Sequence, residues 1–231
     1  MLYRAAAYVL GLAVLPAWPA EAQGLAPGRP GPYVIDVRVA TVAVPQDTGV
    51  FPPLPSGTAV PSRAFGVDLG GHVYLLQLGA ARLGIGAAFQ RMRGTASPAE
   101  PAAGSTSAAA PALPDIEATF TSIAPQLSLN FGSSAGWSYL SAGYGRAEIA
   151  SASSAYGGSG SDTDPVPADS VGSGSRASIS LGGGARWFMR RRVAFSFDVR
   201  FHLMPAGVAR GGAAPTPRAT LVAASAGMSF R

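Results

Sequence analysis

Eight segments of this chain alternate apolar and polar residues, and the connections between them are alternately long and very short. The segments cover residues 33–44, 63–77, 82–93, 118–131, 137–150, 176–188, 193–204 and 218–230. Period-two alternation is typical of a β-strand whose two faces meet different environments, and about 9–11 residues suffice for a tilted strand to cross a membrane. Connections 78–81, 132–136 and 189–192 are short, whereas 45–62, 94–117, 151–175 and 205–217 are long and rich in small and polar residues. The pattern predicts an all-β fold, an eight-stranded antiparallel up-and-down transmembrane β-barrel.

The seventh segment defines the two faces of the predicted wall most clearly. One face carries Val193, Phe195, Phe197, Val199, Phe201 and Leu203, and the other carries Ser196, Asp198, Arg200 and His202. An arginine on the lipid face of a barrel costs about 2–4 kcal/mol at the bilayer midplane. We therefore expect the apolar face to meet lipid and the polar face to line the lumen.

The same alternation assigns a set of charged side chains to the lumen. The predicted lumen cluster is Asp36, Arg38, Asp68, His72, Arg146, Glu148, Arg186, Asp198, Arg200 and His202. The fifth segment is ambiguous, because its two charged residues share a face with Leu140 and Tyr144. An eight-stranded barrel is just wide enough to be filled by its own side chains, so charges of both signs predict a lumen plugged by ion pairs.

Aromatic residues give a second indication of the lipid-facing side. Tyr33, Phe131, Trp137, Trp187 and Phe230 lie at strand ends next to short turns or the chain end, on faces assigned to lipid. Aromatic rings concentrate where hydrocarbon meets headgroups. We predict that these five residues form an aromatic girdle.

The N-terminal residues have the features of an export signal. Arg4 precedes an apolar stretch, residues 5–18, and Ala20-Glu21-Ala22 has the small-x-small form that signal peptidase recognises. We predict a signal peptide over residues 1–22, cleavage before Gln23 and a barrel domain over residues 23–231. No later segment approaches the roughly 18–20 apolar residues of a membrane-spanning helix.

Composition excludes several kinds of chemistry. The chain has no cysteine, which rules out disulfides and thiol ligands, and its net charge of +5 comes from arginines that are scattered along the sequence. A nucleic-acid site needs a concentrated basic patch, so we expect no nucleic-acid partner. The sequence also predicts no catalytic, cofactor or metal site.

The last predicted strand, Thr220 to Phe230 (TLVAASAGMSF), has alternating apolar residues and a terminal aromatic. With phrases such as Gly70-Gly71-His72-Val73-Tyr74, it resembles the small eight-stranded outer membrane β-barrel family, which includes the transmembrane domain of outer membrane protein A. The resemblance implies insertion into the outer membrane of a Gram-negative bacterium by the barrel-assembly machinery, with short turns in the periplasm and long loops outside. Arg231, which follows Phe230, departs from the family pattern.

Several functions are compatible with this reading. The favoured one is a structural or surface-interaction barrel, a monomer in contact with outer-membrane lipids, whose loop ligand the sequence does not identify. The alternative is a narrow or gated porin-like channel for water or small ions. A lipid-modifying enzyme is less favoured, because the His-x-Ser pair of barrel deacylases is missing. Two residues after His72 and His202, where that pair has a serine, this chain has Tyr74 and Met204. His202 with Asp198 is the remaining conceivable dyad. A secreted or periplasmic β-sandwich, soluble without detergent, is a further alternative.

Overall fold

The computed structural model describes residues 32–46, 58–97, 115–154, 169–172, 174–207 and 217–231. Its strands are β1 (Tyr33–Ala43), β2 (Arg63–Leu78), β3 (Ala81–Ala96), β4 (Asp115–Ser133), β5 (Gly136–Ser154), β6 (Asp169–Gly172), β7 (Arg176–Arg190), β8 (Val193–Met204) and β9 (Ala219–Phe230). Every strand pair is antiparallel, and among the described residues no helix is long and apolar enough to span a membrane. The predicted signal peptide, residues 1–22, lies outside the described residues.

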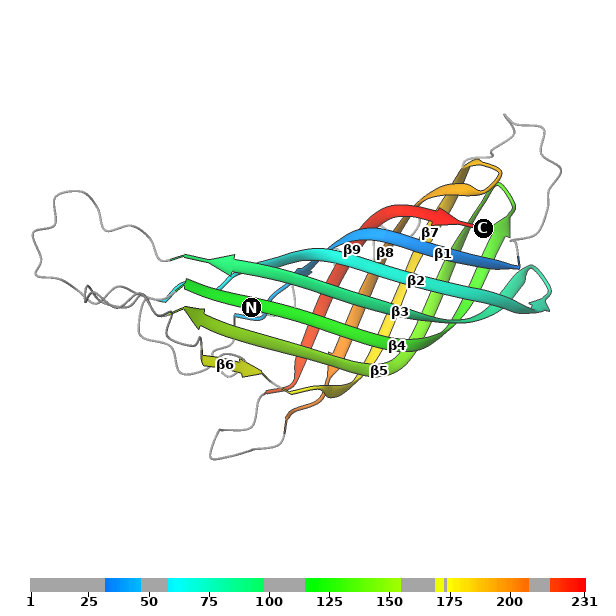
Figure 1. The fold of residues 1–231 in the computed structure, drawn as a ribbon. Helices are drawn as coiled ribbons and strands as arrows, with labels where there is room; N and C mark the ends of the chain where they lie inside the picture. Colours follow the sequence, from blue (N-terminus) through cyan, green and yellow to red (C-terminus); the bar gives the residue numbers. More distant parts are fainter. Residues whose placement is uncertain (1–31, 47–57, 98–114, 155–168, 173, 208–216) are drawn as a thin grey trace, which may run out of the picture.

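Eight of the strands form one closed ring. Neighbouring strands pair in the order β4-β3-β2-β1-β9-β8-β7-β5, and β4 also pairs with β5, which closes the sheet. Figure 1 shows the strands running obliquely around the resulting cylinder. The predicted eight-stranded up-and-down barrel is confirmed, and the single closed sheet excludes the two-sheet sandwich alternative.

The two ends of the barrel differ. Short turns join β2 to β3, β4 to β5 and β7 to β8 at one end, called the turn end here, and the opposite end is called the loop end. The β2–β3 turn contains Gly79 with a φ of +59°, a conformation that glycine adopts without steric cost. The chain end at Arg231 also lies at the turn end (Figure 1).

Three neighbouring strands are longer than predicted at the loop end. β3 spans 16 residues and β4 and β5 span 19 each, compared with 12 for β8 and for β9. The short strand β6 pairs with β5 inside a region that the sequence assigned to a loop. In β5 the added residues 151–154 are only Ala and Ser, which give little apolar-polar contrast, whereas the added residues of β4, Asp115-Ile116-Glu117, do alternate.

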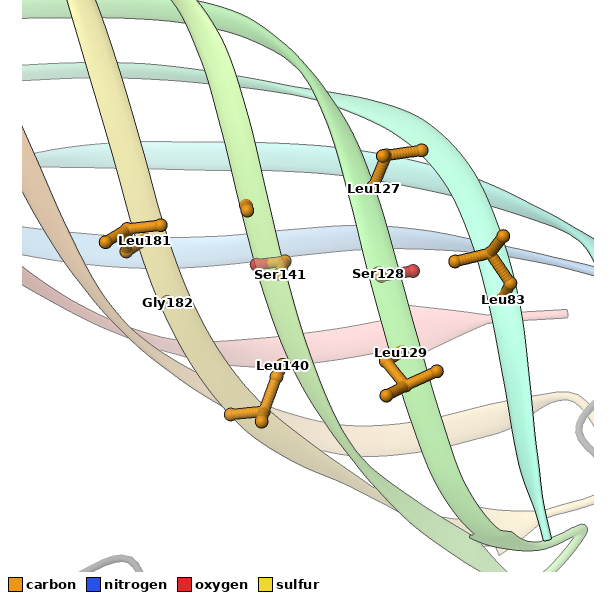
Figure 2. A pocket seen from close by; sticks show the side chains of 9 residues that line it. Leu83, Leu127, Ser128, Leu129, Leu140, Ser141, Leu181 and Gly182 are labelled. Carbon is orange, nitrogen blue, oxygen red and sulfur yellow. The ribbon is translucent and has the colours of Figure 1, made fainter. Parts of the chain in front are cut away.

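The outer wall is apolar on all eight strands of the ring. Exposed large apolar side chains include Tyr33, Phe65, Ile85, Ile123, Leu140, Ile179, Phe195 and Val222, one from each strand. Figure 2 shows leucines of β3, β4, β5 and β7 around an open depression of about 430 Å³ on this wall. An apolar surface that surrounds the molecule is far larger than the patches that soluble monomers expose.

The polarity of the two faces inverts part-way along β3, β4 and β5. From the turn end, the outward face of β4 carries Phe131, Leu129, Leu127, Pro125 and Ile123, followed by Thr121, Thr119, Glu117 and Asp115. Its inward face changes in the opposite direction, from Asn130, Ser128 and Gln126 to Phe120, Ala118 and Ile116. The loop-end part of these strands therefore has an apolar interior and a polar exterior, the arrangement expected of a barrel surrounded by water.

The inversion explains an error in the predicted phase of β5. Trp137 is buried and faces inward, whereas Arg146 is exposed and Glu148 half-buried on the outward face with Leu140 and Tyr144. The assignment of Arg146 and Glu148 to the lumen and of Trp137 to the outer girdle was therefore wrong. The two charges lie where the outer surface has already become polar, so they indicate external water and not the lumen.

Candidate functional site

The lumen is filled by side chains at three levels. An aromatic cluster occupies the turn end, a network of charged residues the middle, and an apolar core the loop end. Because the lumen is the only enclosed polar region that the sequence singled out, it is the candidate functional site.

Asp36 of β1 is the centre of one half of the charged network. Its two carboxylate oxygens accept hydrogen bonds from Nε and Nη2 of Arg186, at 2.9 and 2.6 Å, and the Ser229 hydroxyl donates a further one. The Nη2 atom of Arg38 lies 2.7 Å from Asp36 Oδ2. The Asp36–Arg186 contact joins strands that lie 150 residues apart in the sequence.

Arg38 continues the network into the other half. It donates hydrogen bonds to Asp68 (2.8 Å), to the Tyr139 hydroxyl (3.2 Å) and to the Ser196 hydroxyl (3.2 Å). The Tyr139 hydroxyl in turn donates to Asp198 Oδ2 at 2.7 Å. Arg200 binds the same carboxylate through Nε and Nη2, both at 3.2 Å.

The network contains three carboxylates and three guanidinium groups, Asp36, Asp68, Asp198, Arg38, Arg186 and Arg200, all at most 4% exposed. Burying an isolated charge costs several kcal/mol, and a pair offsets this cost only when the remaining donors and acceptors are also bound. Here hydroxyls of Tyr139, Ser225 and Ser229 bind carboxylate oxygens. Three atoms of the network, Asp68 Oδ1, Arg186 Nη1 and Arg200 Nη1, have no hydrogen-bond partner among the described residues. The cluster is therefore electrically balanced and cross-links the wall from inside.

Glycines on neighbouring strands make room for the large polar side chains. A Cβ atom on Gly184 would lie 2.8 Å from the Tyr139 hydroxyl oxygen, and one on Gly86 would lie 2.6 Å from Cδ2 of His72. Gly182 and Gly184 of β7 are therefore part of the packing of the lumen, whereas a Cβ atom on Gly183 would meet the outward-facing Leu140.

Aromatic rings close the turn end. Trp137 lies 5.9 Å from Tyr74 in an edge-to-face arrangement and 4.8 Å from Phe188 in a stacked one, measured between ring centroids. The Arg231 guanidinium lies 3.8 Å from the Phe188 ring centroid on the side of the chain end. Arg231 also donates hydrogen bonds to the carbonyl oxygens of Arg191 and Ser134 in two different turns. This residue, a departure from the family pattern, thus covers the aromatic cluster.

The loop end of the lumen is closed by an apolar core. Buried side chains from every strand of the ring except β7 meet there: Ala40, Val42, Val44, Ala64, Met92, Ile116, Ala118, Phe120, Ala147, Ile149, Met204, Ala219, Leu221 and Ala223. The core follows directly from the inversion, since the inward residues of β3, β4 and β5 are apolar in this part. On β7 the inward residues at this level are polar, namely Arg176 and Ser178, and both are buried.

The two histidines do not form a catalytic arrangement with an acid. His202 Nε2 lies 2.8 Å from Gln90 Oε1, and its ring packs edge-on against Phe120. The Asp198 oxygens are bound by Arg200 and Tyr139, so the conceivable His202–Asp198 dyad is not assembled. His72 is buried over Gly86, and neither of its ring nitrogens has a hydrogen-bond partner among the described residues.

The structure places eight of the ten predicted lumen residues inside the barrel: Asp36, Arg38, Asp68, His72, Arg186, Asp198, Arg200 and His202. Four predicted girdle residues, Tyr33, Phe131, Trp187 and Phe230, lie exposed on the outer wall. Sequence reasoning missed Tyr139, which connects the two halves of the network. The alternation in β5 could have revealed it, since Tyr139 shares a face with Trp137 and Ser141, and the opposite face carries Leu140 and Ala142.

Comparisons with known proteins found matches among solved structures, at low sequence identity. No protein-family model matches the chain, and no curated protein matches it. Among solved structures, it is similar to Ail, the attachment invasion locus protein of Yersinia pestis, in complex with the heparin analogue sucrose octasulfate. That match has 12% identity and a TM-score of 0.48, and covers 86% of this chain and 96% of that one. Neisserial surface protein A has 11% identity and a TM-score of 0.47 over 87% of this chain and 97% of that one. OprG, an outer membrane protein of Pseudomonas aeruginosa, has 14% identity and a TM-score of 0.45 over 88% of this chain and 97% of that one.

The ring of eight antiparallel strands, closed by the β4–β5 pairing, decides the type of protein. The chain is a small eight-stranded β-barrel. The resemblance predicted from the terminal strand is therefore confirmed at the level of fold.

Proposed function

We propose that this barrel is a structural or surface-interaction component of the outer membrane, with a lumen that does not conduct. The observation that carries the proposal is the filling of the lumen at three levels, an aromatic cluster, a balanced ion-pair network and an apolar core. A channel would need all three levels to open. In the charged network Asp36 would have to separate from Arg186. In the apolar core at the loop end, water would have to enter between residues such as Leu221 and Ile149.

The apolar wall supports placement in a membrane. The short turns and Arg231 then face the periplasm and the long loops face outward, as in outer-membrane barrels generally. The barrel-assembly machinery would insert the chain, outer-membrane lipids would contact the leucine-rich wall, and we propose a monomer.

The long strands β3, β4 and β5 support a role at the cell surface. Beyond the inversion they present a polar outer face that includes Arg91, Arg93, Glu117 and Glu148, while their inner face packs in the apolar core. Such a segment remains folded in water and offers a surface to external partners. No enzymatic role is proposed, because the only candidate dyad is not assembled.

Bilayer conductance of the refolded full chain tests the closed lumen. We expect no unit steps at moderate voltage, with folding confirmed beforehand by heat-modifiable migration on a detergent gel. Reproducible steps whose size changes in Asp198→Asn would establish a channel instead.

Membrane fractionation tests the location. The protein is expected in the outer-membrane fraction and to need detergent for extraction. Recovery in the soluble periplasmic fraction would refute the placement.

A further inference from the structure

A hollow opens on the outer surface where β7 separates from β5. Tyr144, Gly145, Arg146, Ser175 and Ala177 line it, and it encloses about 350 Å³. The β5–β7 ladder ends one step farther on, where Ala147 pairs with Arg176. Ala177 adds little side-chain bulk to the hollow, and Gly145 contributes only backbone, since a Cβ atom there would point toward Ile123 O and Ala124 of β4.

The hollow lies at the level where the outer face changes from apolar to charged. Toward the turn end, the neighbouring outward residues are Ala142 on β5 and Ile179 on β7, whereas toward the loop end Glu148 follows. A group bound there would contact hydrocarbon on one side and water on the other. Lipid headgroups occupy this boundary in a bilayer.

The side chains around the hollow suit a phosphate group. Arg146 is exposed, and none of the ion pairs among the described residues includes it, whereas Arg93 on the same face is paired with Glu117. A guanidinium group presents paired N–H donors that match phosphate oxygens. The Ser175 hydroxyl can add a donor, and the exposed Tyr144 ring offers an apolar face with a polar tip.

We propose that this hollow binds the phosphate-bearing headgroup of an anionic lipid in the outer leaflet. Arg146 and Ser175 hold the phosphate, and Tyr144 packs against the first carbons below it. The inference rests on the membrane placement proposed above and adds to it a specific lipid site on one side of the barrel.

The test is a titration of the folded full chain in dodecyl maltoside micelles with dihexanoyl phosphatidic acid, followed by NMR. The amide resonances of Gly145 and Ala177 are expected to shift and to saturate. Arg146→Gln should weaken binding about 5–20-fold, because it removes a charge-assisted contact to phosphate. The matched control is Arg91→Gln, which removes the same charge from the outer face of β3, away from the hollow, and should change the affinity less than about twofold.

Three results would overturn the proposal. Equal weakening of phosphatidic acid binding by Arg146→Gln and Arg91→Gln would indicate that the lipid is attracted by the outward-facing arginines in general. Binding of inorganic phosphate as tight as that of phosphatidic acid would indicate a site for a free anion, and equally tight binding of dihexanoyl phosphatidylcholine would show that net negative charge is not recognised. The titration does not depend on where the protein resides in the cell, so its failure is distinguishable from failure of the fractionation experiment.

Discussion

Asp36→Asn is expected to lower the free energy of unfolding by about 3–5 kcal/mol. Asp36 is the one carboxylate that forms an ion pair with Arg186 among the described residues, and the Arg186 side chain is fully buried. Replacing the carboxylate by an amide leaves a buried guanidinium without a counter-charge. Breaking one member of a buried pair costs this much because the desolvation penalty of the other member is no longer offset.

Equilibrium urea unfolding in lipid vesicles measures this effect. The double variant Asp36→Leu with Arg186→Met should be less destabilised than Asp36→Asn, because it removes both charges together. The control is Glu117→Gln, which breaks the exposed Arg93–Glu117 pair and should cost at most about 1 kcal/mol. A loss below about 1 kcal/mol in Asp36→Asn would mean that water reaches Arg186, contrary to a closed lumen.

Val37→Arg is expected to destabilise the barrel by about 2–4 kcal/mol in a bilayer. Val37 is 47% exposed on the outer wall, between Leu69 of β2 and Met228 of β9. In a soluble protein such a position would tolerate arginine. In a membrane barrel the same side chain has to enter hydrocarbon.

The matched control for this change is Thr119→Arg. Thr119 is also on the outward face, but on the loop-end side of the inversion in β4, where Glu117 is its neighbour on that face. We expect its effect on the free energy of unfolding to stay within about 0.5 kcal/mol. Similar effects of the two substitutions in vesicles would contradict the assigned boundary.

Strands with one environment on each side along their whole length were predictable from the sequence. β8 is the clearest case, since Phe195, Phe197 and Val199 stay on one face and Asp198 and Arg200 on the other. β5 was assigned the wrong phase because its outer environment changes from apolar to polar part-way along. A period-two pattern reports which residues share a face, but it does not report which face is inside when both faces change character.

The partners inside the lumen were not predictable in the same way. Alternation placed Asp36 and Arg186 on inward faces, but their contact depends on closure of the ring and on the stagger between strands far apart in sequence. The apolar core at the loop end was missed for a related reason. Its small members, such as Ala118 and Ala147, give little contrast, and its large members, such as Phe120 and Ile149, lie beyond the inversion, where an inward residue is apolar.

A nitroxide scan along β4 in vesicles tests the central claim most directly. The chain has no cysteine, so each single-cysteine variant carries one label. Labels at Ile123, Leu127 and Leu129 should collide mainly with dissolved oxygen, labels at Thr119 and Thr121 mainly with a water-soluble nickel chelate, and labels at Gln126 and Ser128 with neither. Oxygen access at Gln126 and Ser128, or no change of environment between Ile123 and Thr121, would contradict a closed barrel that passes from lipid into water at this level.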